Sequence, residues 1–177
     1  MADKFQRVIS ADSHINEPYD LYWNALGDQF GDRTPRVINE YKGQSGKFWY
    51  GGRNIIKLHD VEKDVESRYR LDVGYIPQIR QRFQEEAGIE AEVLNPGSIG
   101  GILGNPDNSS ELKRACFEVY HDWMVEFISF DPKRFIGVAV IPLYDDVGKA
   151  VADLEKYGKK GLRTALIRFQ PPEGRPP

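Results

Sequence analysis

The stretch "SELKRACFEVYHDWMVEFISFDPKRFIGVAVIP", residues 110–142, decides the fold class because it contains one complete change from helix to strand. Apolar residues recur at roughly helical spacing from Leu112 to Ile128, and the preceding Asn-Ser-Ser-Glu segment is typical of a helix N-terminus. Asp131-Pro132 ends this periodicity. The run from Phe135 to Pro142 is almost continuously apolar, which indicates a buried strand.

The same alternation of helix and strand extends to both sides of this stretch. Further strands are expected at Arg7–Ala11, 89–96 and Leu162–Phe169. Further helices are expected at residues 18–27, Tyr75–Ala87 and Asp145–Gly158, the last with Val147, Ala150, Val151 and Leu154 facing inward. Strands separated by helices predict right-handed crossovers and a parallel α/β sheet. Two architectures fit: a complete small doubly wound sheet, or about four β/α units of a (β/α)₈ TIM barrel, which typically needs about 250 residues.

Residues 28–60 interrupt the alternation. The segments "PRVINEY", "KFWYGG" and "NIIKL" have the pattern of short antiparallel strands, with Gly51-Gly52 at a hairpin turn. We therefore expect a small β-rich insertion on the surface, after the first strand and helix of the chain.

The composition excludes several classes of protein. Lys and Arg total 24 against 27 Asp and Glu, so the chain carries no positive charge excess for nucleic acid or an anionic membrane. A single cysteine, Cys116, excludes an internal disulfide, and its place on an apolar helix face indicates a buried small hydrophobe. The sequence has no secretory leader pattern and no apolar run long enough to span a bilayer, so we expect a cytoplasmic protein.

Asp12-Ser13-His14 follows directly on the first apolar run. Residues at i and i+2 of an extended chain point to the same side, so Asp12 and His14 can converge on one object. A carboxylate and an imidazole are both ligands of zinc and similar metals, although two ligands do not complete such a site. The alternative is a strand-end turn, in which Asp12 caps the next helix and His14 bonds to the backbone.

The segments "ADSHINEPYDLYW" (11–23), "EAGIEAEVLNP" (86–96), residues 111–143 and "AVADLEKYGKKGLRTALI" (150–167) together resemble the amidohydrolase-related ("amidohydrolase 2") proteins. That family includes the zinc-dependent aminocarboxymuconate semialdehyde decarboxylase and the resorcylate decarboxylases. The resemblance implies a metal-dependent (β/α)₈ barrel, of which residues 1–177 would form the N-terminal half as one incomplete domain. The implied reactions are hydrolysis or non-oxidative decarboxylation of small, often aromatic, carboxylate or carbonyl compounds.

The resemblance also implies roles for individual residues. Asp12 and His14 would bind a divalent metal, zinc first and manganese as the alternative. The other ligands and the general acid or base would be encoded beyond Pro177, because His59 and His121 stand where the family has no ligand. The catalytic residues therefore stay unknown.

Three further residues are candidates for substrate binding. Glu17 follows His14 closely, although it can equally be an acid at a helix N-terminus. Asn95 closes the second strand of the sheet, and Arg168 ends the last strand, where it can meet an anionic substrate or a surface acid. The glycine-rich loop "NPGSIGGILGNPDN" carries no phosphate-binding motif and is interpreted as a loop at the rim of the site.

An isolated half barrel would be inactive and would lack neighbours for its first and last strands. Inward side chains, such as Val93, Val138, Val140 and Ala165, would lack the opposite half of the core. The partners expected are a small-molecule carboxylate and either further copies of the chain or a complementing C-terminal half. The rival interpretations are a non-catalytic interaction half and a compact doubly wound module that binds a small ligand.

Overall fold

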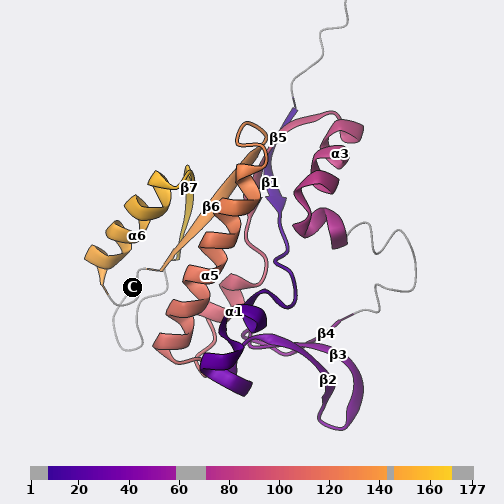
Figure 1. The fold of residues 1–177 in the computed structure, drawn as a ribbon, viewed down its shortest axis with the longest axis vertical. Coiled ribbons are helices and arrows are strands. Elements are labelled where there is room, and N and C mark those ends of the chain that lie inside the picture. The colour runs from indigo at the N-terminus through magenta and orange to yellow at the C-terminus, as the bar shows by residue number, and fades with distance from the viewer. Residues whose placement is uncertain (1–7, 59–70, 143–145, 169–177) are drawn as a thin grey trace, which may run out of the picture.

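The computed structural model describes residues 8–58, 71–142 and 146–168, which form an α/β fold with two separate sheets (Figure 1). The strands are β1 (Val8–His14), β2 (Arg36–Tyr41), β3 (Gln44–Tyr50), β4 (Ile56–Lys57), β5 (Ile89–Asn95), β6 (Phe135–Pro142) and β7 (Thr164–Arg168). The helices are α1 (Leu21–Phe30), α3 (Pro77–Ala87), α4 (Ile99–Leu103), α5 (Ser110–Ser129) and α6 (Val147–Lys159), with a 3₁₀ turn at Gly31–Arg33.

The larger sheet has the strand order β1-β5-β6-β7, and every neighbouring pair is parallel. Helices α3, α5 and α6 pack against it, and Figure 1 shows α3 and α6 at opposite sides of the molecule with α5 between them. This is a parallel half-barrel sheet, as the alternation of strands and helices predicts. The chain therefore has the fold of the N-terminal part of a (β/α)₈ barrel.

Local signals set most helix boundaries. The Ser109 hydroxyl accepts a hydrogen bond from Leu112 N at 3.2 Å and caps α5, and the Asp146 carboxylate accepts one from Gly148 N at 2.7 Å and caps α6. Helix α3 has Pro77 in its first turn and ends at Gly88, whose φ of +69° suits glycine.

The core lies between the sheet and α5. Phe135 packs on Phe127 with ring centroids 5.3 Å apart, and Cys116 is fully buried. Burial raises the pKa of the Cys116 thiol to about 12, so this side chain is a buried hydrophobe, as expected, rather than a nucleophile. At Gly137 an added Cβ would lie 2.9 Å from Leu162 and Met124, so glycine lets α5 approach the strand closely.

The inward face predicted for α6 is wrong at three of its four positions. Val147, Val151 and Leu154 are exposed, Val147 to 65%, whereas Ala150, Asp153 and Tyr157 are buried. The exposed and the buried residues both recur at helical spacing, so hydropathy alone predicts the wrong face of the helix as the inward one. The orientation follows instead from specific contacts: Asp153 forms an ion pair with Arg114 of α5, and the Tyr157 ring lies 4.3 Å from the His121 ring.

Two other predictions need correction. Strand β1 runs on to His14 instead of ending at Ala11, and it is largely exposed because it forms one edge of the described sheet. The predicted glycine-rich loop contains the short helix α4, which buries Ile99, Ile102 and Leu103.

The strand register also decides which β7 residue faces the barrel interior. Val140 pairs with Leu166 and Ala139 with Ala165, so Leu166 rather than Ala165 shares a face with Val138 and Val140. Both valines are buried.

Strands β2, β3 and β4 form a separate antiparallel sheet between α1 and α3 in sequence, at the bottom of the view in Figure 1. Trp49 of β3 is buried and joins the hydrophobic core, so this sheet is packed against the rest of the fold. Gly51 has a φ of +108°, and an added Cβ would lie 2.6 Å from Pro35 Cα, so only glycine fits this turn.

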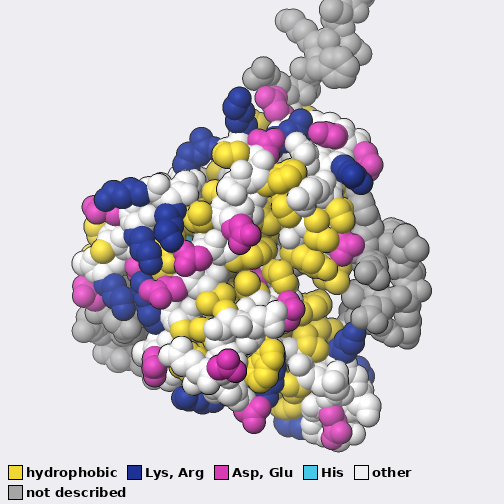
Figure 2. All heavy atoms as spheres, viewed as in Figure 1, with side chains coloured by type: hydrophobic (Ala, Val, Ile, Leu, Met, Phe, Trp, Pro, Cys, Tyr) yellow, Lys and Arg dark blue, Asp and Glu magenta, His cyan; other side chains and the backbone are white. Residues whose placement is uncertain are grey.

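Figure 2 shows the same face with its side chains. Charged side chains gather over α5 and α6, whereas hydrophobic side chains gather in the middle of the face, between α3 and the β2–β4 sheet. Across the described ranges, no helix is both long and apolar enough to cross a membrane.

Candidate functional site

The two predicted metal ligands, Asp12 and His14, lie together at the C-terminal end of β1 and are called the metal pair below. His14 Nε2 lies 3.7 Å from Asp12 Oδ1, and both side chains are exposed at the edge of the sheet. Asn95, which pairs with His14 in the register of β1 and β5, donates a hydrogen bond from Nδ2 to Asp12 Oδ1 at 3.1 Å. Three of the five predicted site residues therefore lie at one point, where the first two parallel strands end.

A buried ion pair holds this strand end from the other face of the sheet. Glu92 of β5 and Arg80 of α3 are both buried, and Arg80 Nε donates to Glu92 Oε2 at 2.7 Å. Arg80 also donates to the backbone carbonyl of His14 at 3.0 Å, and Ser13 Oγ donates to Glu92 Oε1 at 2.8 Å. The backbone of the metal pair is thus fixed by a network that the side chains of Asp12 and His14 do not enter.

The protonation state of Glu92 follows from this network. Burial by itself raises the pKa of the Glu92 carboxyl, but the hydrogen bonds and positive charge of Arg80 outweigh it. Hydrogen bonds from Ser13 and Gln84 act in the same direction as Arg80, so the pKa lies below its ordinary value. Glu92 is therefore a charged structural partner of Arg80 at neutral pH.

Glu17 joins the loops that follow β1 and β5. Its buried carboxylate accepts hydrogen bonds from Ser98 N at 2.7 Å, Ser98 Oγ at 3.0 Å and Ile99 N at 3.1 Å. Burial raises the pKa of Glu17 despite these donors. An added Cβ at Gly97 would lie 2.7 Å from Glu17 Oε2, so the glycine makes room for this contact.

A pocket of about 460 Å³ opens beside these loops. Its floor includes Asn16 and Glu17, which directly follow the metal pair in sequence, and Gly97 and Ser98, which follow β5. The remaining lining residues come from the segment before α1, from α4, and from the β2–β4 sheet with its turn: Tyr19, Gly101, Trp49, Gly52, Arg53, Asn54, Ile56 and Leu58. The size is that of a small-molecule site.

The pocket combines aromatic walls with one cation. The Tyr19 and Trp49 rings lie 6.3 Å apart, centroid to centroid, and Ile56 and Leu58 add aliphatic surface. Arg53 supplies a guanidinium at the pocket, and within the part of the chain that the structure describes it has no acidic partner. An aromatic wall beside a guanidinium is chemistry that suits a small aromatic anion.

The other sequence candidates lie elsewhere. Arg168 ends β7, two strands away from β5, and its side chain lies outside the described part of the structure. His59 also lies outside the described residues. His121 is fully buried in α5.

Asp12 and His14 fit a divalent metal as two of its ligands, because they present a carboxylate oxygen and an imidazole nitrogen at the mouth of the sheet. Within residues 8–58, 71–142 and 146–168, no group of three or more His, Cys, Asp or Glu side chains is arranged to hold a metal. The pair therefore needs ligands from outside this part of the chain.

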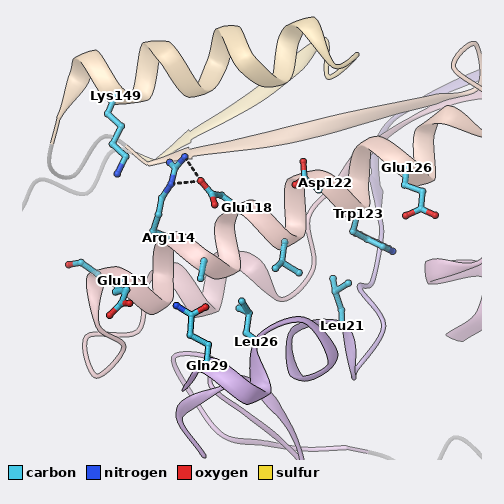
Figure 3. Close-up of a pocket in the computed structure, with 13 residues that line it drawn as sticks. Leu21, Leu26, Gln29, Glu111, Arg114, Glu118, Asp122, Trp123, Glu126 and Lys149 are labelled. Atoms are coloured by element: carbon cyan, nitrogen blue, oxygen red, sulfur yellow. Dashed lines mark hydrogen bonds and ion pairs between the residues drawn. The ribbon is translucent and has the colours of Figure 1, made fainter. Parts of the chain in front are cut away.

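A larger groove of about 940 Å³ lies on the outer side of the helices, between α1, α5 and Lys149 of α6 (Figure 3). Three of its charged side chains form ion pairs: Arg114 pairs with Glu118 at 2.8 Å and also with Asp153, and Asp122 pairs with Lys160. None of the predicted site residues lines it. We therefore place the candidate site at the strand ends rather than in this groove.

Sequence reasoning missed two parts of the site. The charged Glu92 inside an otherwise apolar strand is a signal for the buried pair with Arg80, since a buried acid needs a partner. The contribution of Trp49 and Arg53 has no local signal, because it depends on how the β2–β4 sheet packs beside the loops that follow β1 and β5.

The comparisons with known proteins find a similarity in structure but none in sequence. No protein-family profile matches the sequence, and no curated protein matches it. Among solved structures, an amidohydrolase from Mycobacterium avium subsp. paratuberculosis K-10 superposes with a TM-score of 0.66 at 18% identity, over 92% of this chain and 49% of that one. A 2,6-dihydroxybenzoate decarboxylase, in complex with 2,6-dihydroxybenzoate, superposes with a TM-score of 0.53 at 19% identity, over 97% and 42%.

The chain thus spans about half the length of these two structures or less. At such low identity the likeness concerns the fold. It agrees with the half-barrel sheet described above and with the family resemblance of the sequence. The chain has the fold of part of such a (β/α)₈ barrel.

Proposed function

We propose that this chain is the N-terminal portion of a metal-dependent enzyme that acts on small aromatic carboxylates by hydrolysis or decarboxylation. The observation that carries the proposal is that the 460 Å³ pocket is lined by residues of the two loops that follow β1, with its Asp12–His14 pair, and β5. In parallel barrels, chemistry is performed at the C-terminal ends of the strands.

Each part of the site has a distinct role in this proposal. Asp12 and His14 hold a divalent cation, zinc in first place, together with ligands from outside the described chain. When bound, such a cation polarises a carboxylate or lowers the pKa of a water molecule to about 7. Arg53 binds the substrate's carboxylate, while Trp49 and Tyr19 contact its ring.

Glu17 has a structural role within the pocket. Its carboxylate accepts hydrogen bonds from Ser98 and Ile99, so it fixes the loop after β5 against the loop after β1. Although burial raises the pKa of Glu17, its carboxylate is held by these donors, so we propose that the general acid or base comes from elsewhere in the complete barrel. The 177-residue chain should then bind ligands without turning them over.

Ligand binding tests the pocket. The probe is 2,6-dihydroxybenzoate, which the neighbouring decarboxylase binds, titrated into the full chain and followed by calorimetry and by Trp49 fluorescence. A charge-assisted hydrogen bond contributes about 1.5 to 3 kcal/mol, so Arg53→Gln should weaken binding roughly 10- to 100-fold. Resorcinol, which has the ring without the carboxylate, should bind weakly to both proteins.

The matched control is Arg82→Gln, which removes an exposed arginine of α3 outside the pocket and should leave the affinity unchanged. Trp49→Phe should remove the fluorescence change but not the calorimetric signal. Equal affinity of the wild-type protein and Arg53→Gln for the carboxylate would refute the assignment of the pocket.

The metal is tested separately. In a protein that also carries the missing strands and their ligands, Asp12→Ala and His14→Ala should each abolish zinc binding, measured by elemental analysis after dialysis. Both side chains are exposed, so the urea midpoint of the metal-free protein should change little. Retention of zinc by both variants would rule out the ligand assignment.

A further inference from the structure

The turn that carries Arg53 joins β3 to β4 and spans residues 51–55. Arg53 itself is exposed and lines the 460 Å³ pocket. Gly51 and Gly52, the two residues before it, are buried. Because buried backbone carbonyls need hydrogen-bond donors, the oxygens of these two glycines must find donors within the protein.

Two asparagines from the loop between α4 and α5 supply these donors. Asn105 Nδ2 donates to Gly52 O at 2.9 Å and lies 3.5 Å from Gly51 O. Asn108 Nδ2 donates to Gly51 O at 2.9 Å. Asn105 is buried and Asn108 is half-buried. We call this pair the asparagine clamp, because both amides hold the two residues that precede Arg53.

The asparagine clamp is itself held in place. Asn105 Oδ1 accepts a hydrogen bond from Asp107 N at 3.0 Å, and since that amide can only donate, Nδ2 is the atom directed at the turn. Asn108 Nδ2 also donates to Ile102 O at 3.0 Å. Ile102 is fully buried in the hydrophobic core, so the clamp connects the turn of Arg53 to the core of the fold.

Close packing limits the backbone of the turn from two sides. An added Cβ at Gly51 would lie 2.6 Å from Pro35 Cα, so the chain before β2 touches the turn directly. On the other side, the position of a Cβ on Gly101 of α4 lies 3.6 Å from Arg53 N. The turn therefore has little room to move while the asparagine clamp is intact.

We propose that Asn105 and Asn108 are positioning residues for Arg53, which hold its guanidinium ready to bind the carboxylate of a small-molecule ligand. The inference rests on the function proposed above and adds the residues that set its preference for a carboxylate over a neutral ring. Neither asparagine lines the pocket, so both act through Arg53. A segment that is ordered before binding loses less conformational entropy when the ligand binds, so the affinity is higher.

Binding of 2,6-dihydroxybenzoate to the full chain, measured by calorimetry, tests the asparagine clamp. Asn105→Ala should weaken this binding about 3- to 10-fold, the loss expected when one side chain must be ordered on binding. Resorcinol has the ring without the carboxylate. Its weak affinity, measured by chemical-shift titration, should be the same for the variant and the wild-type protein.

A double-mutant cycle distinguishes positioning of Arg53 from a general effect on the pocket. If Asn105 acts through the guanidinium, Asn105→Ala should cause no further loss of carboxylate affinity in a protein that already carries Arg53→Gln. An equal loss in both backgrounds would overturn the proposal, because the asparagine would then act independently of Arg53. A parallel loss of resorcinol affinity would overturn it as well.

Two variants control for effects on folding. Tyr120→Phe removes another buried hydrogen bond from a side chain to a backbone carbonyl, at 3.0 Å, and should lower the urea midpoint without changing the affinity for the carboxylate. Asn108→Ala removes the donor to Gly51 O from a half-buried position, and it serves if Asn105→Ala does not fold. It should weaken binding of the carboxylate about 2- to 5-fold and follow the same cycle with Arg53→Gln.

The ligand-free chain provides a readout that does not depend on binding. The NMR order parameter of the Arg53 amide should be about 0.85 in the wild-type protein and fall below about 0.6 in Asn105→Ala. A rigid turn in the variant would contradict the clamp. A mobile turn with unchanged carboxylate affinity would contradict its role in binding.

The two proposals fail in different ways. If Arg53→Gln weakens binding of the carboxylate while Asn105→Ala and Asn108→Ala both leave it unchanged, the positioning role is wrong and the pocket assignment stands. If Arg53→Gln itself leaves the affinity unchanged, the pocket assignment is wrong, and the positioning role falls with it.

Discussion

His121 makes the stability of this fold dependent on pH. Its imidazole is fully buried between α5 and β6, with Nδ1 at 2.6 Å from the Phe117 carbonyl oxygen and Nε2 at 3.1 Å from Val140 N. The Val140 amide can only donate, so Nε2 must be the unprotonated nitrogen and Nδ1 must carry the proton. The ring therefore holds the strand to the helix only when it is neutral.

The magnitude follows from the pKa. Burial lowers the pKa of His121 from 6.5 to about 4, so the unfolded chain binds more protons than the folded one between these values. Stability is thus complete above about pH 6.5 and falls as the pH is lowered toward 4. At about 1.36 kcal/mol per pH unit, the loss is about 3 kcal/mol, a large part of the 5–15 kcal/mol typical of a domain.

The assay is urea unfolding at a series of pH values between 7 and 4. We expect the free energy of unfolding of His121→Gln, which keeps hydrogen-bonding groups without titrating, to be lower at pH 7. Its deficit relative to the wild-type protein should then shrink by about 3 kcal/mol toward pH 4. Tyr157→Phe keeps the ring that lies 4.3 Å from the imidazole and should follow the wild-type pH profile. Parallel profiles for the wild-type protein and His121→Gln would refute the argument.

Two further changes test the loops and the buried pair around the metal site. Gly97→Ala forces a Cβ to within 2.7 Å of Glu17 Oε2 and should lower the free energy of unfolding by about 1–3 kcal/mol, whereas Gly158→Ala, with no atom within 4 Å, should have no destabilising effect in the same urea assay. Arg80→Ala leaves the buried Glu92 carboxylate without its ion-pair partner and should cost about 3–5 kcal/mol, and an unchanged urea midpoint would contradict this.

The order of elements could be predicted from the sequence because each element depends on local signals. The Ser109 cap, Gly88 at the end of α3 and the apolar run of β6 all act over a few residues. The proximity of Asp12 and His14 could be predicted for the same reason, since they are two positions apart on one strand, whereas their binding of a metal stays a prediction.

The pocket could not be predicted, because its residues meet only through tertiary packing. Trp49 and Arg53 belong to a sheet that the sequence presents as a surface insertion, yet they line the same pocket as Ser98, more than forty positions away. The inward face of α6 was predicted wrongly for a related reason. The ion pair between Asp153 and Arg114 sets the orientation of the helix, although other positions carry larger apolar side chains. Partners distant in sequence decide both cases.

The candidate site lies where β5 separates from β6, and side chains of α5 stabilise this separation. The ladder between β5 and β6 runs from the hydrogen bond of Glu92 N to Arg134 O, at 2.9 Å, to the pair of Leu94 with Gly137. Beyond this point β5 turns away toward Gly97. The backbone N–H and C=O groups of the even-numbered residues of β6 would then lack hydrogen-bond partners.

Two neighbouring residues of α5 take the place of the missing strand. Tyr120 Oη donates to Val138 O at 3.0 Å, and His121 Nε2 accepts from Val140 N at 3.1 Å. Because these backbone groups are satisfied from the helix, β5 is free to diverge and to carry its loop to Glu17 and the pocket. The buried histidine therefore supports the site without touching it, which is why its charge state should affect the stability of the fold rather than the affinity for a ligand.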